Sequence, residues 1–96
     1  MQVNPLVPKS HTFKKTISNV PVQGTWGSLY ISSPITVSTD ISGIGKRIEV
    51  NFVLSGSDTA TCFINTISSN SVTVFLARGN GSSGVTGTIY ITIYED

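Results

Sequence analysis

Few side chains in this 96-residue chain could carry out catalysis. His11 is the only histidine and Cys62 the only cysteine, and they fall in different predicted elements, so no nucleophile–base pair is indicated. One cysteine allows neither an internal disulfide nor a cysteine-rich zinc site. Of the carboxylates only Glu95 and Asp96 are adjacent, and no Asp- and Asn-rich calcium loop occurs. We therefore expect a protein that is not an enzyme and that carries no cofactor and no metal site.

The charge of the chain argues against nucleic acid and membrane partners. Charged residues make up 11% of the chain and the net charge is +1, whereas phosphate binding needs clustered Lys and Arg. The pairs Lys14–Lys15 and Lys46–Arg47 are isolated, and we interpret them as solvated charges that discourage strand-to-strand aggregation. No stretch approaches the roughly 18 apolar residues of a membrane span, and no signal peptide is indicated. We expect neither nucleic-acid binding nor membrane insertion.

The side chains that remain are suited to recognition. The chain contains 14 Ser and 12 Thr, so its surface is rich in neutral hydroxyl groups. Planar aromatic rings stack on the C–H faces of sugars, while amide, guanidinium and backbone groups bind the hydroxyls. On this basis the candidate ligand-binding residues are Trp26, Tyr30, Arg78, Asn80 and Ser82. The alternative interpretation is that the aromatic residues pack in a core or an interface and that Arg78–Gly84 is a plain hairpin loop.

Alternating apolar and polar residues predict the elements that carry these side chains. We expect strands at Thr25–Ser32 and Ile35–Thr39 and, in the second half, at Ile48–Leu54, Thr61–Ile67, Val72–Ala77 and Ile89–Tyr94. Val20–Gly24 is predicted as a turn or crossing, and Arg78–Gly87 as a long loop rich in Gly and Ser. The last four strands are predicted to form an antiparallel meander. No window shows a helical repeat, so the fold class is all-β, a small antiparallel β-sandwich.

The first part of the chain differs from the rest. Pro5 and Pro8 favour extended backbone, so residues 1–19 are predicted as an N-terminal arm with a possible short strand at His11–Ser18, and residues 20–96 as the sandwich domain. Several strands carry apolar residues on both faces, which indicates two packed sheets or a sheet covered by another subunit. A monomer of this size would struggle to cover Phe75 and the two C-terminal tyrosines, so we expect an oligomer.

Three segments resemble a known family: GTWGSLYISSPITV at positions 24–37, TCFINTISSNSVTVFLA at 61–77 and GTIYITIYE at 87–95. Together they are similar to the H-type lectin fold and, equally, to the C-terminal receptor-binding domains of phage tail fibres. Other viral knob domains share this pattern. The resemblance implies a homotrimer, and it places Trp26 and the loop Arg78–Gly84 where ligand contacts would lie.

These observations lead to two functional expectations. The first is a virion receptor-binding domain, at the tip of a tail fibre, or a lectin-like adhesin, which recognises cell-surface carbohydrate of the host. The second is a capsid decoration or baseplate protein, whose partners are other virion proteins. In either case we expect the chain to be made in the host cytoplasm, to be part of the virion, and to be extracellular when assembled.

Overall fold

The computed structural model describes residues 9–55, 59–80 and 82–95, and within them the chain forms seven strands and no helix, as the alternation predicts. None of the described residues belongs to a helix that could cross a membrane. The strands are β1 (Ser10–Trp26), β2 (Leu29–Ser32), β3 (Ile35–Ser38), β4 (Arg47–Leu54), β5 (Thr61–Ile67), β6 (Ser71–Arg78) and β7 (Ser82–Tyr94).

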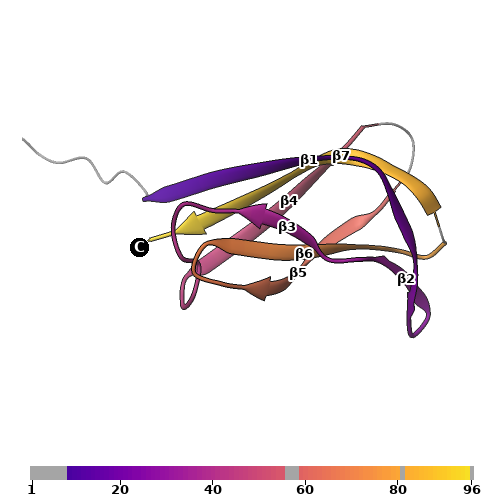
Figure 1. Ribbon diagram of the computed structural model, residues 1–96, viewed down its shortest axis with the longest axis horizontal. Coiled ribbons are helices and arrows are strands. Elements are labelled where there is room, and N and C mark those ends of the chain that lie inside the picture. Colours follow the sequence, from indigo (N-terminus) through magenta and orange to yellow (C-terminus); the bar gives the residue numbers. More distant parts are fainter. Residues whose placement is uncertain (1–8, 56–58, 81, 96) are drawn as a thin grey trace, which may run out of the picture.

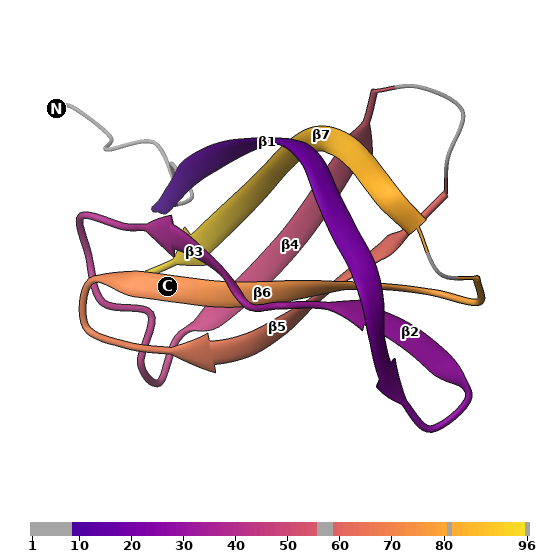
Figure 2. The same cartoon turned by 45° about the vertical axis from the view of Figure 1, so that its right-hand side comes forward.

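All pairings are antiparallel, and the strand order is β3-β6-β2-β1-β7-β4, with β5 on the other edge of β6. Figures 1 and 2 show this sheet folding over on itself at β1. The first part of β1, β7 and β4 form one layer, here named the β4 layer. The end of β1 with β2, β3, β6 and β5 forms the other, the β6 layer. The described chain is therefore an antiparallel, sandwich-like all-β fold.

The bend in β1 has a local cause. Ser10–Val22 pairs with β7, while Val22–Trp26 pairs with β2, and the register shifts on both sides of Val20. Extra residues of this kind bend a strand and increase its twist. Asn19 adopts a left-handed backbone with φ of 53°, which asparagine tolerates better than most residues, and Pro21 lacks the N–H that a regular ladder would use.

The prediction for this region was partly wrong. The chain does cross between layers at Val20–Gly24, but it remains in β1 throughout. The reversal comes later, at Gly27, because this glycine has a φ of 62°, as the first position of a two-residue hairpin loop of type II′ requires. The predicted strand Thr25–Ser32 is therefore two strands joined by a tight turn.

The core lies between the two layers. Ile89, Ile91 and Ile93 of β7 face the β6 layer and have no exposed surface, which confirms the predicted alternation. Val85 of β7 is also buried, and the side chains that complete the core from the other strands are Ile17, Val22, Val37, Cys62, Val72, Val74 and Leu76. Each fully buried aliphatic side chain contributes about 1.5–3 kcal/mol of transfer free energy.

Two further predictions are corrected by the pairing and one is confirmed. The last four strands do not form a meander, because β7 pairs with β1 and β4, whereas β6 pairs with β5, β2 and β3. The possible strand at His11–Ser18 is confirmed as part of β1, while residues 1–8 of the predicted arm lie outside the described part. The predicted loop Arg78–Gly87 is mostly strand, since β7 begins at Ser82. Alternation indicates which face a residue occupies, but it does not indicate the neighbouring strand.

Gly87 shows how closely β7 and β4 pack. A Cβ atom at this position would lie 2.5 Å from the carbonyl oxygen of Val53 and 2.8 Å from Cε1 of the Phe52 ring. The first of these atoms belongs to the backbone of the neighbouring strand, so it cannot move away as a flexible side chain could. Glycine is therefore required at position 87 because any side chain would collide with β4, and not because of a special loop conformation.

We expect the substitution Gly87→Ala to lower the free energy of unfolding by about 1–3 kcal/mol, because the added methyl group overpacks the β4–β7 contact. Urea denaturation of both proteins measures the change. Gly79→Ala is the matched control, since a Cβ there has no neighbour within 4 Å. Equal unfolding midpoints for the two variants would contradict this account of Gly87.

Candidate functional site

The two residues best suited to catalysis do not form a site together. Cys62 lies in β5, faces the core and is 8% exposed. Burial raises the pKa of its thiol to about 11, because the thiolate is poorly solvated in an apolar core. His11 lies at the start of β1 and contacts a different residue, since its Nε2 is 3.0 Å from Oε2 of Glu95.

Glu95 connects three parts of the chain at one end of the fold. Its Oε1 accepts a hydrogen bond of 2.7 Å from Nζ of Lys46, and its backbone N–H donates to the carbonyl of Lys9. The hydrogen bond from Lys46, and then that from His11, hold the pKa of the Glu95 carboxyl below its usual value. This exposed group ties the first and last strands to the loop before β4, which is a structural role. Among the described residues no three His, Cys, Asp or Glu side chains could hold a metal ion.

We expect the Cys62 thiol to be unreactive in the folded protein at pH 8. With a pKa of about 11 against an ordinary value of 9.0, its thiolate fraction is roughly a hundredfold lower, and the thiolate is the reactive form. Reaction with a chromogenic disulfide reagent, followed by absorbance with and without urea, measures the rate in each state. Equal rates in the folded and unfolded protein would contradict the buried placement.

A cluster of three aromatic side chains lies on the outer face of the β6 layer. Phe75 points outward because its neighbours Val74 and Leu76 point into the core. Phe63 is its register partner on β5, and the two rings stack with centroids 5.6 Å apart. Trp26 meets Phe75 edge to face, at 5.9 Å and 88°. We name Trp26, Phe63 and Phe75 the aromatic cluster.

The aromatic cluster borders a surface pocket. Its volume is about 360 Å³ and it is lined by Trp26, Ile31, Ser32, Pro34, Asn65 and Phe75; we name it the aromatic pocket. Trp26 remains 61% exposed in spite of its contact with Phe75. Asn65 is also exposed and uses one amide hydrogen in a long bond, of 3.4 Å, to Oγ1 of Thr73. The rest of its carboxamide is accessible to a ligand.

The pocket exists because the strand beside β6 is interrupted. Both β2 and β3 pair with the same edge of β6, and Ser33–Pro34 separates them. At this gap the N–H of Leu76 donates instead to Oγ of Ser32 at 2.9 Å, and the Ser32 hydroxyl donates to the carbonyl of Ser33. A side chain thus satisfies a buried backbone donor that the missing strand residue would have satisfied.

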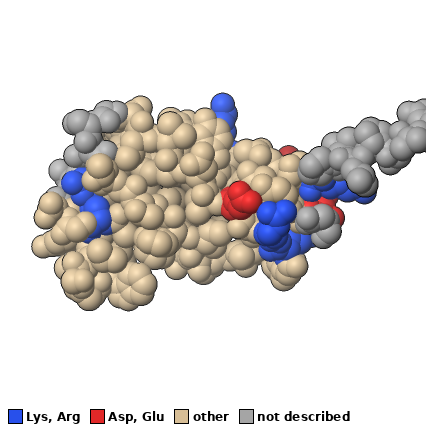
Figure 3. Space-filling model, turned by 180° about the vertical axis from the view of Figure 1, so that it is seen from behind, with Lys and Arg blue, Asp and Glu red and all other residues tan. Residues whose placement is uncertain are grey.

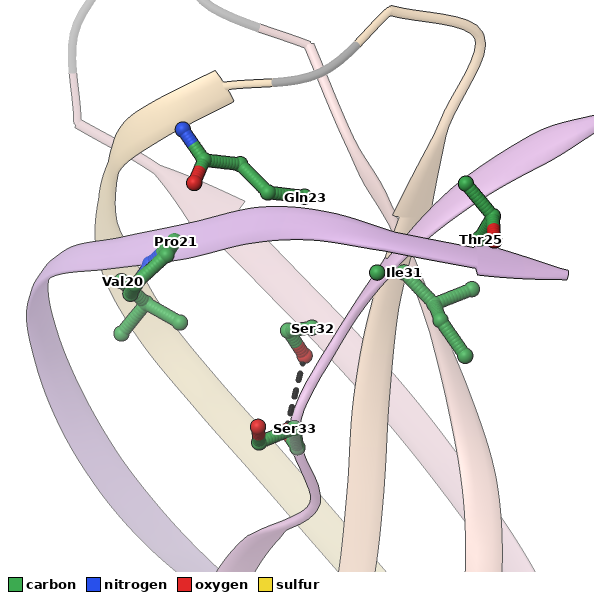
Figure 4. Close-up of a pocket in the computed structure, with 8 residues that line it drawn as sticks. Val20, Pro21, Gln23, Thr25, Ile31, Ser32 and Ser33 are labelled. Atoms are coloured by element: carbon green, nitrogen blue, oxygen red, sulfur yellow. Dashed lines mark hydrogen bonds between the residues drawn. The ribbon is translucent and has the colours of Figure 1, made fainter.

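A second pocket lies beside the first, on the inner side of the β1 bend. It has a volume of about 450 Å³ and is lined by Val20, Pro21, Gln23, Gly24, Thr25, Ile31, Ser32 and Ser33; we name it the polar pocket. Figure 4 shows Val20 on one side and Ser33 on the other, with the Ser33 hydroxyl turned toward Val20. The two pockets are adjacent because Ile31 and Ser32 line both.

The predicted ligand-binding residues are divided between two faces. Tyr30 and Arg78 are register partners on β2 and β6. Trp26 is the partner of Leu29, so strand alternation places it on the opposite face from Tyr30. Asn80 is exposed in the connection between β6 and β7, and the side chain of Ser82 lies outside the described part. The structure therefore brings Tyr30 and Arg78 together but separates Trp26 from them.

Of the aromatic cluster and the aromatic pocket, the sequence predicted only Trp26 as a site residue, and it missed Ile31, Ser32, Pro34, Phe63, Asn65 and Phe75. The signal for Phe75 was present, because alternation placed it on the outward face of its strand. Its contacts with Phe63 and Trp26 depend on the register of β5 and on the hairpin after β1, which no local pattern specifies.

Charge is absent from the lining of both pockets, in so far as the structure describes it. Figure 3 shows that most of one face of the molecule is uncharged, and that charged groups gather mainly toward the end where β1 begins. Comparison with known protein families, curated proteins and solved structures finds no match for this chain.

Proposed function

We propose that this chain is a carbohydrate-binding, lectin-like domain that recognises cell-surface glycans, and that Trp26 is the surface on which the sugar stacks. The observation that carries the proposal is the placement of Trp26. Its side chain is 61% exposed, yet it is fixed edge to face against Phe75 at the rim of a pocket. An aromatic side chain held rigidly in solvent binds at a low cost in conformational entropy.

The surroundings of Trp26 match both the apolar C–H face of a pyranose ring and the hydroxyl groups at its edge. Phe63 is 43% exposed and Leu29 36% exposed, so apolar surface extends to both sides of the pocket. A contiguous exposed apolar patch marks an interaction site more often than an incidental feature. The carboxamide of Asn65 supplies both donors and acceptors at the edge of this patch. Stacking on the ring and hydrogen bonds from the amide are the combination that sugar recognition requires.

The proposal includes the setting that the family resemblance implies, a homotrimer at the tip of a virion fibre. Trp26 lies beside the two-residue hairpin loop that joins β1 to β2, at one end of the fold (Figure 2). A site at an end of the molecule is well placed to meet a cell surface. The mass of the assembly in solution tests this part: a trimer supports it, and a stable monomer contradicts it.

The second candidate is a capsid decoration or baseplate protein that uses the same patch to bind another virion protein. The exposure of Leu29 and Phe63 favours it, because together with Trp26 they make an apolar surface wider than the aromatic pocket. Aromatic residues are also typical anchors of protein interfaces. The two candidates differ in their ligand and share the residues that bind it.

We expect Trp26→Ala to weaken glycan binding by about tenfold or more, because the stacking surface is lost. Trp26 is the only tryptophan, so intrinsic fluorescence of the unaltered protein reports directly on a sugar bound there, and calorimetry measures the variant. Val53→Ala is the matched control, since Val53 is a 52% exposed apolar residue of the β4 layer.

Two results would count against the carbohydrate proposal. One is an intact assembly that binds no sugar on a glycan array. The other is sugar binding that Trp26→Ala and Val53→Ala affect equally. Binding to isolated virion proteins that is lost in Trp26→Ala, together with an empty glycan array, would favour the decoration or baseplate role.

A further inference from the structure

The aromatic and polar pockets adjoin along β2, because Ile31 and Ser32 line both. Their volumes, about 360 Å³ and 450 Å³, are similar. A ligand that stacks on Trp26 and extends past Ile31 therefore enters the polar pocket.

The two pockets offer different chemistry. The aromatic pocket presents ring faces and one carboxamide. The polar pocket is lined by Gln23 and Ser33, which are both exposed residues and carry a carboxamide and a hydroxyl group. Gly24 lies in its lining, where a Cβ atom would come within 3.1 Å of the Ile31 carbonyl oxygen. Because Gly24 has no side chain, the backbone of β1 and β2 is accessible to a ligand at this point.

The hydroxyl of Ser32 is not available to a ligand. It accepts from the Leu76 N–H and donates to the Ser33 carbonyl. The residue is also only 4% exposed. Ser32 therefore fixes the floor between the pockets, and Gln23 and Ser33 are the side chains free to bind in the polar half.

The chemistry of the lining also specifies the charge of the ligand. Among the described residues that line the two pockets there is no Lys, Arg or His to bind a carboxylate or sulfate, and no Asp or Glu to bind an amino sugar. A charged group moved from water into such surroundings loses solvation without a compensating partner. An acidic sugar is recognised most effectively by charge-assisted hydrogen bonds, and this lining has no cation to make them.

We propose that the site has two subsites and binds a neutral oligosaccharide of at least two units, with one unit on Trp26 and the next against Gln23 and Ser33. This inference rests on the proposed carbohydrate-binding function and adds the ligand's length and charge. The aromatic subsite supplies most of the affinity, and the polar subsite distinguishes an oligosaccharide from a single sugar.

The test compares neutral hexose and N-acetylhexosamine oligomers of one to four units with the same oligomers carrying sialic or glucuronic acid, by calorimetry. We expect affinity to rise about threefold to tenfold from one unit to two, as one or two added hydrogen bonds would give. The double variant Gln23→Ala/Ser33→Ala abolishes this rise. The matched control is Asn51→Ala/Thr16→Ala, which removes one exposed amide and one exposed hydroxyl from the β4 layer.

The results distinguish failure of the two-subsite inference from failure of the proposed carbohydrate-binding function. Trp26-dependent binding that is equal for one unit and for longer oligomers overturns the two-subsite arrangement. Tighter binding of the acidic oligomers overturns the neutral specificity. Both results leave the carbohydrate-binding function standing, whereas no binding to any oligomer overturns that function and this inference with it.

Discussion

The fold depends on the continuity of β1 through both layers. Backbone hydrogen bonds of one strand join it to β7 in the first half and to β2 in the second, so the layers cannot separate without breaking that ladder. The bend near Asn19 and Pro21 sets the angle between them, and the core of β6 and β7 side chains fills the space that the bend encloses. The same bend leaves a hollow on its inner side, which is the polar pocket.

The aromatic pocket has a comparable origin, in a place where regular pairing stops. Pro34 cannot donate a ladder hydrogen bond, so the chain leaves β6 between β2 and β3, and the Ser32 hydroxyl replaces the lost partner of Leu76. A fully paired strand at this position would have filled the space beside Phe75 that the aromatic pocket occupies. Two neighbouring irregularities of the sheet thus form the site, namely the bend in β1 and the gap between β2 and β3. The paired strands around them hold it in place.

The two outer faces of the sandwich differ in how far their aromatic residues are exposed. On the β4 layer the guanidinium of Arg47 lies 3.7 Å from the centre of the Tyr94 ring, and Tyr90 and Tyr94 are half-buried by the chain itself. On the β6 layer Trp26 and Phe63 remain exposed. Among the described residues, the exposed aromatic side chains of the β6 layer gather at a pocket, as expected of a binding site, whereas the β4 layer exposes the aliphatic Val53.

The sequence by itself determined the strand content, the inward faces and the scarcity of catalytic groups, because these follow from local alternation and from residue counts. It also determined that Phe75 points outward. Only the tertiary structure decided that β7 pairs with β1 and β4, since partner and register are set by contacts between residues far apart in the chain. For the same reason it alone joined Trp26 to Phe75 and Asn65, and placed Tyr30 with Arg78 on the opposite face. A shared face can be deduced from spacing within one strand, but a binding site here required three strands whose relative positions only the folded core fixes.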